Sequence, residues 1–237
     1  VGENGAGKST FVKILSGVYT PTEGNIFLDD KKVNITSPIL AQKNGVSLIH
    51  QEPQSFSHLS VAENIFMGHM EGSNFSRVKW QDINNKSKEI LESIGLKIDP
   101  KKVMEGLSIA DQQMIEIAGA LSKNSKVLIM DEPTSPLTPN EVGKLFDIVN
   151  KLKSNGMAII FISHRLEEIR QISDRVTIFR DGDLITTKNI NEVSNEEIIK
   201  FMIGRNIEET EVKENQFIKN DEYILNVKSL SLSKKFN

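Results

Sequence analysis

The sequence reads Gly2-Glu3-Asn4-Gly5-Ala6-Gly7-Lys8-Ser9-Thr10 immediately after its first residue, and this stretch decides the fold. It matches the spacing G-x-x-x-x-G-K-[ST], with a third glycine, Gly5, between the two fixed ones. Glycines let consecutive backbone N–H groups turn inward without Cβ clashes, so the loop can surround phosphate oxygens. We expect Lys8 to reach the β- and γ-phosphates of a nucleotide and Ser9 to hold Mg²⁺. The alternative is a glycine-rich turn before an ordinary helix.

The residues after the loop favour a helix. Phe11, Ile14, Leu15 and Val18 recur at i, i+3, i+4 and i+7, the spacing of one helix face. The helix then begins at the loop, and the positive end of its dipole faces the phosphates. This is the context that a phosphate-binding loop requires.

Composition bounds the class of protein. The chain has 237 residues, of which 38% are hydrophobic and 26% charged, as in an ordinary globular protein with a sizeable core. The net charge of −3 argues against a general nucleic-acid-binding surface. There is no cysteine, which excludes disulfides and thiolate metal sites. The best apolar run, residues 157–162, is too short to cross a bilayer, so a membrane role would need a partner.

Two polar residues follow predicted strands. Gln51 comes directly after the predicted strand 46–50, and His164 follows the apolar strand pattern 157–162. A polar residue at the carboxyl end of a strand can face a bound ligand. Each residue taken alone has a structural alternative. Gln51 could be an ordinary loop glutamine, and His164 could be a histidine held by structural hydrogen bonds.

A pair of carboxylates follows a third apolar run. Residues 127–130 form a continuous apolar stretch, which predicts a central parallel strand buried on both faces. It leads into Asp131 and Glu132. Adjacent carboxylates at the end of a buried strand repel each other and lose solvation, so a Mg²⁺-phosphate neighbour explains them better than packing does. The alternative is a surface turn.

The remaining patterns alternate between helices and short strands. Ser37-Pro38 begins a helix that Gly45 ends, Ser60 and Ser108 are predicted helix caps, and Asp181-Gly182 is a predicted hairpin turn. Helices are predicted over residues 61–67, 80–94, 110–121, 139–152, 166–172 and 194–203, and short strands over 25–28, 33–35, 175–179 and 184–187.

The ends of the sequence suggest a fragment of a longer protein. The chain starts on the phosphate-binding loop, without the strand that leads into such a loop. Residues 206–222 contain six acidic residues and two lysines with little periodicity, which predicts a linker. Residues 223–227 resume a strand pattern; a disordered tail is the alternative.

Taken in order, these motifs match one family. The loop at residues 2–10, Gln51, residues 107–111 opening a helix, residues 127–132 and His164 resemble the nucleotide-binding subunit of ABC transporters. The sequence is most similar to the sugar-importer branch, whose subunits carry two such domains in one polypeptide. Four stretches are typical of that branch: residues 49–52, 59–65, 131–135 and 162–168.

The resemblance implies an α/β fold of the P-loop NTPase class. Its mostly parallel, RecA-like sheet would carry an antiparallel β subdomain and an inserted helical subdomain at about residues 56–121. Residues 1–205 would be the first nucleotide-binding domain, 206–222 an acidic linker, and 223–237 the start of a second ABC domain.

The resemblance also assigns roles around ATP and Mg²⁺. Gln51 would face Mg²⁺ and the γ-phosphate, and Asp131 would hold Mg²⁺ through water, together with Ser9. Glu132 would act on the attacking water as base or polariser, and His164 would be the switch histidine on the γ-phosphate. The ATP-binding loop would comprise Gly2, Glu3, Asn4, Gly5, Ala6, Gly7, Lys8, Ser9 and Thr10.

A second motif is expected to contact ATP held by the opposite domain. This signature motif consists of Leu107, Ser108, Ile109, Ala110 and Asp111. The signature motif departs from the family pattern at Asp111, where glutamine is common. The loop after Glu132 departs from its own family pattern at residues 135–138. The aromatic residue that stacks on adenine in this family would precede Val1.

The resemblance implies an ATPase that drives import of a monosaccharide or related small solute. It would be a peripheral protein at the cytoplasmic face of the membrane. Its direct partners would be permease subunits and a second ABC domain, and an extracytoplasmic solute-binding protein would be an indirect partner. Nucleic acid would not be a partner. The permease would dock around residues 54–67, with Phe56, Leu59 and Phe66 as apolar candidates.

Two rival functions remain open at this point. A soluble ABC protein acting on ribosomes or DNA usually carries a long basic segment between its domains, whereas the predicted linker here is short and acidic. A P-loop kinase lacks a signature helix and has no use for His164.

Overall fold

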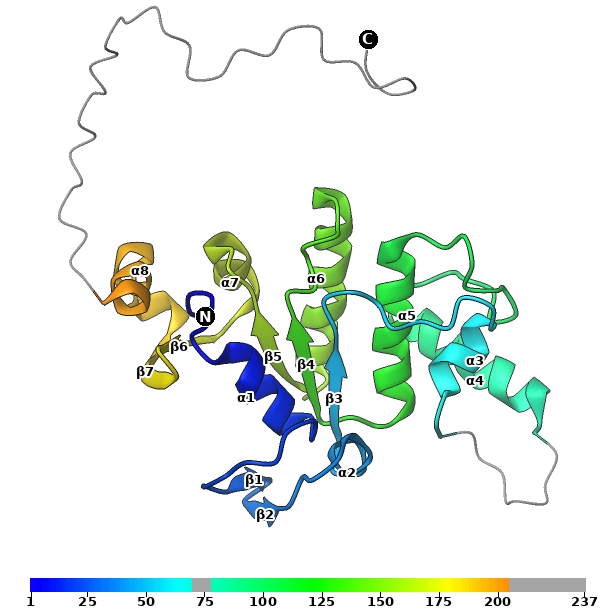
Figure 1. The fold of residues 1–237 in the computed structure, drawn as a ribbon. Coiled ribbons are helices and arrows are strands. Elements are labelled where there is room, and N and C mark those ends of the chain that lie inside the picture. The colour runs from blue at the N-terminus through cyan, green and yellow to red at the C-terminus, as the bar shows by residue number, and fades with distance from the viewer. Residues whose placement is uncertain (70–77, 205–237) are drawn as a thin grey trace, which may run out of the picture. The chain divides into compact units, whose positions relative to one another are not determined.

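The computed structural model describes residues 1–69 and 78–204, and it is built on a parallel sheet (Figure 1). Strands β3 (Val46–Ile49), β4 (Val127–Asp131) and β5 (Ala158–Ile162) pair in the order β3-β4-β5. The register aligns Ile49 with Met130 and Asp131 with Ile162, so the three strands end at one edge. This confirms the prediction that residues 127–130 form the central strand.

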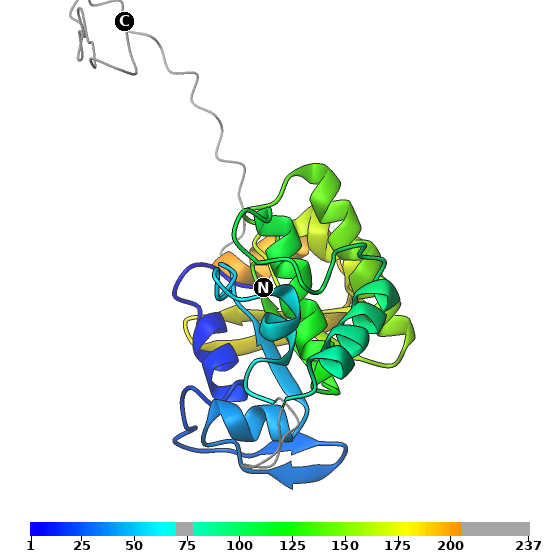
Figure 2. The ribbon, with the colours of Figure 1, turned by 90° about the vertical axis from the view of Figure 1, so that its right-hand side faces the viewer.

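Helices cover both faces of this sheet because β4 alternates its side chains between two cores. Leu128 and Met130 lie in the larger core with α5 (Ile109–Ser122) and α6 (Pro139–Ser154). Ile129 points the other way and packs with α1 (Lys8–Leu15) and α2 (Pro38–Lys43). In Figure 2, α1 and the pair α5 and α6 accordingly lie on opposite sides of the strands.

A group of helices extends the larger core beyond β3. Helices α3 (Val61–Phe66) and α4 (Trp80–Ser93) pack with each other and with α5. The caps of α3 and α5 are the predicted ones. Ser60 forms a capping box with Glu63, and the Ser108 hydroxyl accepts a 3.1 Å hydrogen bond from the Asp111 amide.

Two antiparallel hairpins complete the layers. One joins β1 (Ile26–Leu28) to β2 (Lys31–Val33), and the other joins β6 (Arg175–Arg180) to β7 (Asp183–Asn189). The remaining elements are α7 (Leu166–Ile172), the short helix η1 (Ile190–Glu192) and α8 (Asn195–Ile203).

The strand predicted over residues 33–35 lies two residues earlier, at β2. Asp29 and Asp30 have φ values of 49° and 60°, which makes a tight two-residue turn and places Lys31 opposite Leu28. Ile35, which the prediction placed in the strand, is 1% exposed and belongs to the core beneath the sheet.

The apolar face predicted for α1 is also different. Val12 is the buried residue of this helix, whereas Phe11 is 37% exposed and packs its ring against Phe179 at 5.5 Å. Val18 lies beyond the end of the helix at Leu15 and is exposed. Leu15, which belongs to the predicted stripe, is half-buried and packs with the core that contains Ile129 of β4, so the observed face runs through Val12 and Leu15 and leaves out Phe11 and Val18.

A hollow of about 800 Å³ separates β5 from β6. Val1 lies along its β6 side: the Val1 nitrogen donates to the Thr177 carbonyl at 2.8 Å, and the Phe179 amide donates to the Val1 carbonyl at 2.9 Å. On the other side of the hollow, β5 pairs with β4 along one edge, and no described strand pairs with the edge that faces the hollow.

Two sequence predictions fall outside the fold described above. The linker at residues 206–222 and the strand pattern at 223–227 lie outside the described residues. Within residues 1–69 and 78–204, no helix has the length and apolar character needed to span a membrane.

Candidate active site

The loop at residues 2–10 wraps the start of α1. Gly7 has a φ of 95° at the N-cap position and supplies no side chain to cap the helix. The N–H groups of the first helical turn therefore remain available to an anion. Gly2 lies tightly on β6, because a Cβ there would stand 2.5 Å from the Phe179 carbonyl oxygen. Glu3, Asn4, Gly5, Ser9 and Thr10 are exposed, and Ala6 is buried.

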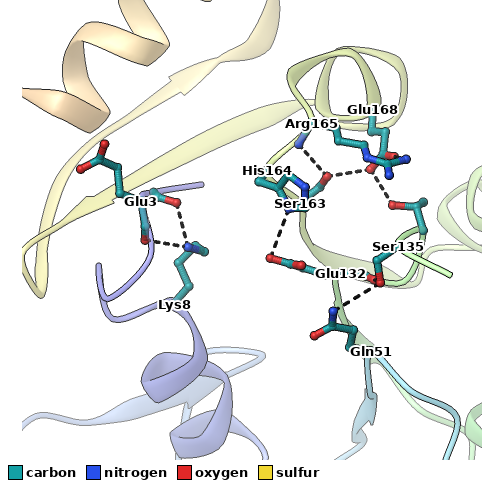
Figure 3. Close-up of polar contacts among 11 residues, drawn as sticks. Glu3, Lys8, Gln51, Glu132, Ser135, Ser163, His164, Arg165 and Glu168 are labelled. Carbon is teal, nitrogen blue, oxygen red and sulfur yellow. Dashed lines mark hydrogen bonds and ion pairs between the residues drawn. The ribbon is translucent and has the colours of Figure 1, made fainter. Parts of the chain in front are cut away.

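The Lys8 ammonium is folded back over its own loop (Figure 3). Its Nζ donates to the Gly2 carbonyl at 2.7 Å and to the Glu3 carbonyl at 2.9 Å. The cation is thus held by neutral carbonyl oxygens on a half-buried side chain. Phosphate oxygens carry full negative charge and form stronger bonds with an ammonium group than carbonyls do.

The chain turns sharply after β4. Glu132 has a φ of 48°, the left-handed region that side chains other than glycine rarely adopt, and its amide donates to the Ile162 carbonyl at 2.9 Å. Such a conformation costs about 1 kcal/mol or more, and strained residues of this kind cluster at functional sites.

The predicted residues on the three strand ends come together (Figure 3). His164 Nδ1 lies 3.4 Å from Glu132 Oε1. Gln51 Nε2 donates to the Ser135 hydroxyl at 3.4 Å, and that hydroxyl donates to the Glu132 carbonyl at 3.1 Å. The side chains of His164 and Glu132 are 59% and 24% exposed, so both are open to a ligand.

The electrostatics of the site favour a cation. Burial raises the pKa of Asp131, the adjacent Glu132 raises it further, and Lys8, His50 and Lys13 oppose the rise. A divalent cation would offset the cost of keeping both carboxylates charged. No three His, Asp or Glu side chains form a metal cluster in the part of the chain that the structure describes. The oxygen atoms of Ser9, Gln51 and Asp131 are nonetheless the kind of ligand that Mg²⁺ takes together with phosphate oxygens.

The structure does not bring the signature motif to the loop. Leu107 is buried, and Ser108, Ile109, Ala110 and Asp111 form the start of α5, on the sheet face opposite α1. Ser108 and Ile109 are exposed. Within this chain the signature motif and the loop of residues 2–10 therefore lie with helices on opposite faces of the sheet.

One buried carboxylate near the site was not predicted. Glu168 on α7 is 7% exposed and accepts hydrogen bonds from Thr134 and Ser163. In the sequence, Glu167 and Glu168 are equivalent acidic residues in a first helical turn. The rotation of α7 against the sheet decides whether Glu167 or Glu168 is buried. The pattern of charges in the sequence does not reveal that rotation.

A second hollow, of about 310 Å³, lies beside the end of β3 and is lined by residues that include Gln54, Phe56, Met67, Glu116 and Lys123. Of the apolar docking candidates, Phe56 is 54% exposed, whereas Phe66 is 8% exposed and belongs to the core. Glu116 accepts a hydrogen bond from the Gln54 amide. We call this hollow the Glu116 groove.

Comparison with known proteins places the chain in a family. The family model described as ABC transporter matches residues 1–135. The chain is 43% identical over 236 residues to the ribose import ATP-binding protein RbsA of Clostridium perfringens strain 13, covering 98% of this chain and 46% of that protein. It is 46% identical over 231 residues to the galactose/methyl galactoside import ATP-binding protein MglA of Fusobacterium nucleatum, covering 98% of this chain and 46% of that protein.

Solved structures give the same result. An ATP-binding cassette of an ABC transporter, in its ADP conformation, superposes with a TM-score of 0.74 at 25% identity over 86% of each chain. The cbiO1 protein of Clostridium perfringens, part of the ABC transporter complex cbiONQ, gives a TM-score of 0.70 at 28% identity, covering 86% of this chain and 82% of that one.

The chain belongs to the ABC transporter family of ATP-binding proteins. Its α/β fold is that of their nucleotide-binding cassettes, as the sequence predicted. It spans less than half the length of the curated relatives that it matches.

The Glu116 groove yields a prediction of pH-dependent stability. Burial raises the pKa of Glu116 to about 7, against the weaker opposing effects of the Gln54 amide and Lys123. The folded state then holds a proton that the unfolded state releases near pH 4.5, so stability is lost as the pH rises through 7. Glu116→Gln should raise the free energy of unfolding by about 1–3 kcal/mol at pH 8 and change it little at pH 5.

Urea unfolding at the two pH values measures this difference. Glu89→Gln on α4 is the matched control, since Glu89 is exposed. A gain for Glu116→Gln that is equal at both pH values would contradict the raised pKa.

Proposed function

We propose that the chain is an ATP-binding and ATP-hydrolysing domain of an ABC importer for a monosaccharide or a related small solute. One observation carries the proposal: Gln51, Glu132 and His164 come from the ends of three neighbouring strands and are linked through Ser135 and a 3.4 Å contact. The Lys8 loop supplies the phosphate donors that these residues would complement. Phosphoryl transfer needs positioned donors and charge more than covalent chemistry, and this arrangement supplies both.

Each group has a definite task in this proposal. Lys8 exchanges the two carbonyls that now hold it for β- and γ-phosphate oxygens, while the first-turn amides of α1 bind the phosphates. Glu132 orients the attacking water and takes its proton. His164, which already lies beside Glu132, contacts the γ-phosphate. It thereby connects the γ-phosphate with the Glu132 carboxylate. Gln51 lies between His50 and Gln54, two residues that line the Glu116 groove.

Ser9, Gln51 and Asp131 would hold Mg²⁺ at this site. When bound, the ion would neutralise the negative charge that builds up on the phosphate oxygens during transfer. Burial and the adjacent Glu132 raise the pKa of Asp131, and a neighbouring cation would oppose that rise.

The relatives support transport over the rival functions. Two of them are named as import ATP-binding proteins, one for ribose and one for galactose or methyl galactoside. The exposed start of α5 is further support, because it leaves Ser108 free to serve a nucleotide on a second ABC domain. Residues 1–205 would form one such domain, with helices at about 56–121 as its helical subdomain.

The proposed partner is a membrane permease, which makes the protein peripheral to the cytoplasmic face of the membrane. The Glu116 groove suits a segment of that permease because it combines the exposed Phe56 ring with a carboxylate and an ammonium group. Its wall continues into the Gln51 loop, so docking there would reach the nucleotide. The permease and an extracytoplasmic binding protein would select the solute.

Removal of the Lys8 ammonium should abolish ATP binding. In Lys8→Ala the loop keeps its amides but loses the only side-chain cation that it contains. Titration of the full-length protein with a fluorescent ATP analogue measures the affinity, and circular dichroism monitors the fold. Lys43→Ala, at an exposed position at the end of α2, is the control and should bind normally. Unchanged affinity in a folded Lys8→Ala protein would remove the phosphate-binding assignment.

Glu132→Gln should separate binding from hydrolysis. Glutamine keeps the size and hydrogen bonding of Glu132 but cannot accept a proton, so ATP should still bind while turnover at this site falls at least about a hundredfold. Single-turnover hydrolysis and nucleotide titration on the same sample provide the two numbers. Glu141→Gln, an exposed helix-cap variant, serves as control. Turnover that survives in Glu132→Gln would show that another group activates the water.

Cysteine crosslinking should locate the permease on the Glu116 groove. The chain has no cysteine of its own, so Gln54→Cys and Phe56→Cys introduce single reactive positions. With permease cysteines on cytoplasmic loops, both should form disulfide-linked products in membranes. Lys188→Cys, an exposed position on β7, should not. Equal crosslinking from Lys188→Cys, or none from the groove, would place the permease elsewhere.

A further inference from the structure

Glu168 is a buried carboxylate to which the proposed mechanism gives no role. It lies in the first turn of α7, four residues after His164 in the sequence, and it is 7% exposed. A charged group in such a place is costly unless donors surround it. Glu168 has three donors: the Ser163 hydroxyl at 2.6 Å and the Thr134 hydroxyl at 2.8 Å on Oε2, and Arg165 Nη1 at 3.3 Å on Oε1.

Two of these donors fix the backbone on either side of His164. The Ser163 hydroxyl gives its proton to Glu168 and accepts a 3.0 Å hydrogen bond from the Arg165 amide. Arg165 is held a second time through its guanidinium group. The peptide that carries His164 is therefore anchored before and after that residue, although the imidazole itself is exposed.

The third donor belongs to a different loop. Thr134 is 2% exposed and follows Glu132 by two residues, in the segment that leads from β4 to α6. Its hydroxyl crosses to Glu168 on α7. One carboxylate thus joins the loop that carries Glu132 to the loop that carries His164, as Figure 3 shows for the His164 side.

We infer that Glu168 is a positioning residue, which holds the loops of Glu132 and His164 in one relative arrangement for ATP hydrolysis. This inference rests on the proposed function. The side chains of the two catalytic candidates contact each other at 3.4 Å, and a contact between exposed groups holds geometry weakly. The backbones are paired as far as the bond from the Glu132 amide to the Ile162 carbonyl, and the buried hydrogen bonds of Glu168 join the two loops beyond that point. A displacement of about 1 Å at a reacting group can cost two orders of magnitude in rate.

The competing explanation is that Glu168 only caps α7. An acidic residue in the first turn of a helix stabilises it, and both Glu167 and Glu168 stand in that turn. The hydrogen bond to Thr134 separates the two explanations, because a cap has no need of the β4–α6 loop. A substitution at Thr134 leaves α7 and its acidic residues intact.

The test is therefore made first at Thr134 in the full-length protein. Thr134→Val keeps the shape but removes the hydroxyl, and kcat should fall about tenfold or more while the Kd for ATP changes less than about twofold. Thr134→Ser restores the hydroxyl and should restore kcat. If Thr134→Val lowers the thermal midpoint but keeps kcat well below that temperature, the role is structural and the inference is wrong.

A second comparison uses the neighbouring acids. Glu168→Gln should lower kcat with ATP binding retained, whereas Glu167→Gln, at an exposed position in the same turn, should leave both unchanged. In a His164→Ala background the effect of Thr134→Val should shrink to less than about twofold, because the residue that it positions is gone. The same loss of kcat in both backgrounds would overturn the inference.

Glu132→Gln, measured alongside, separates this inference from the proposed function. If Glu132→Gln abolishes turnover while Thr134→Val and Glu168→Gln retain it, only the role of Glu168 fails. If Glu132→Gln retains turnover, the proposed mechanism fails, and the inference fails with it.

Discussion

The parallel pairing of β3, β4 and β5 is the constraint on which the site depends. Parallel strands end at the same edge, so their register places the residues after Ile49, Met130 and Ile162 side by side although they are far apart in sequence. The pairing is stable because β4 is buried on both faces, between α1 and α2 on one side and α5 and α6 on the other. Each site residue then needs only a short loop to reach the common edge.

The sequence was sufficient to predict the elements that form this edge. Gln51, Asp131 and His164 follow apolar runs that can be recognised without a structure, and the resemblance to ABC proteins supplied their expected roles. The structure confirms the elements and brings Gln51, Glu132 and His164 together. Their roles, the Mg²⁺ ligands and the contact of Ser108 with a second nucleotide stay predictions.

Other features could not be predicted because they depend on how elements pack. The buried face of α1 is set by Ile129 of β4, and a count of apolar spacing cannot identify that partner. The position of β2 follows from positive φ values at Asp29 and Asp30, residues that also occur in looser turns. The burial of Glu168 rather than Glu167, and the raised pKa of Glu116, arise from contacts between segments distant in sequence.

The side of β5 that faces away from β4 combines unpaired backbone groups with apolar side chains in the described part of the chain. Among the described residues the backbone groups on that side face the hollow next to β6 and pair with no neighbouring strand. Ile159, Ile160 and Phe161, all only half-buried, line the same hollow. An unpaired strand with apolar side chains is a template for edge-to-edge pairing between molecules, and natural proteins normally cover or charge such edges. An additional strand seated at β5 would therefore pair these backbone groups and cover the three apolar side chains.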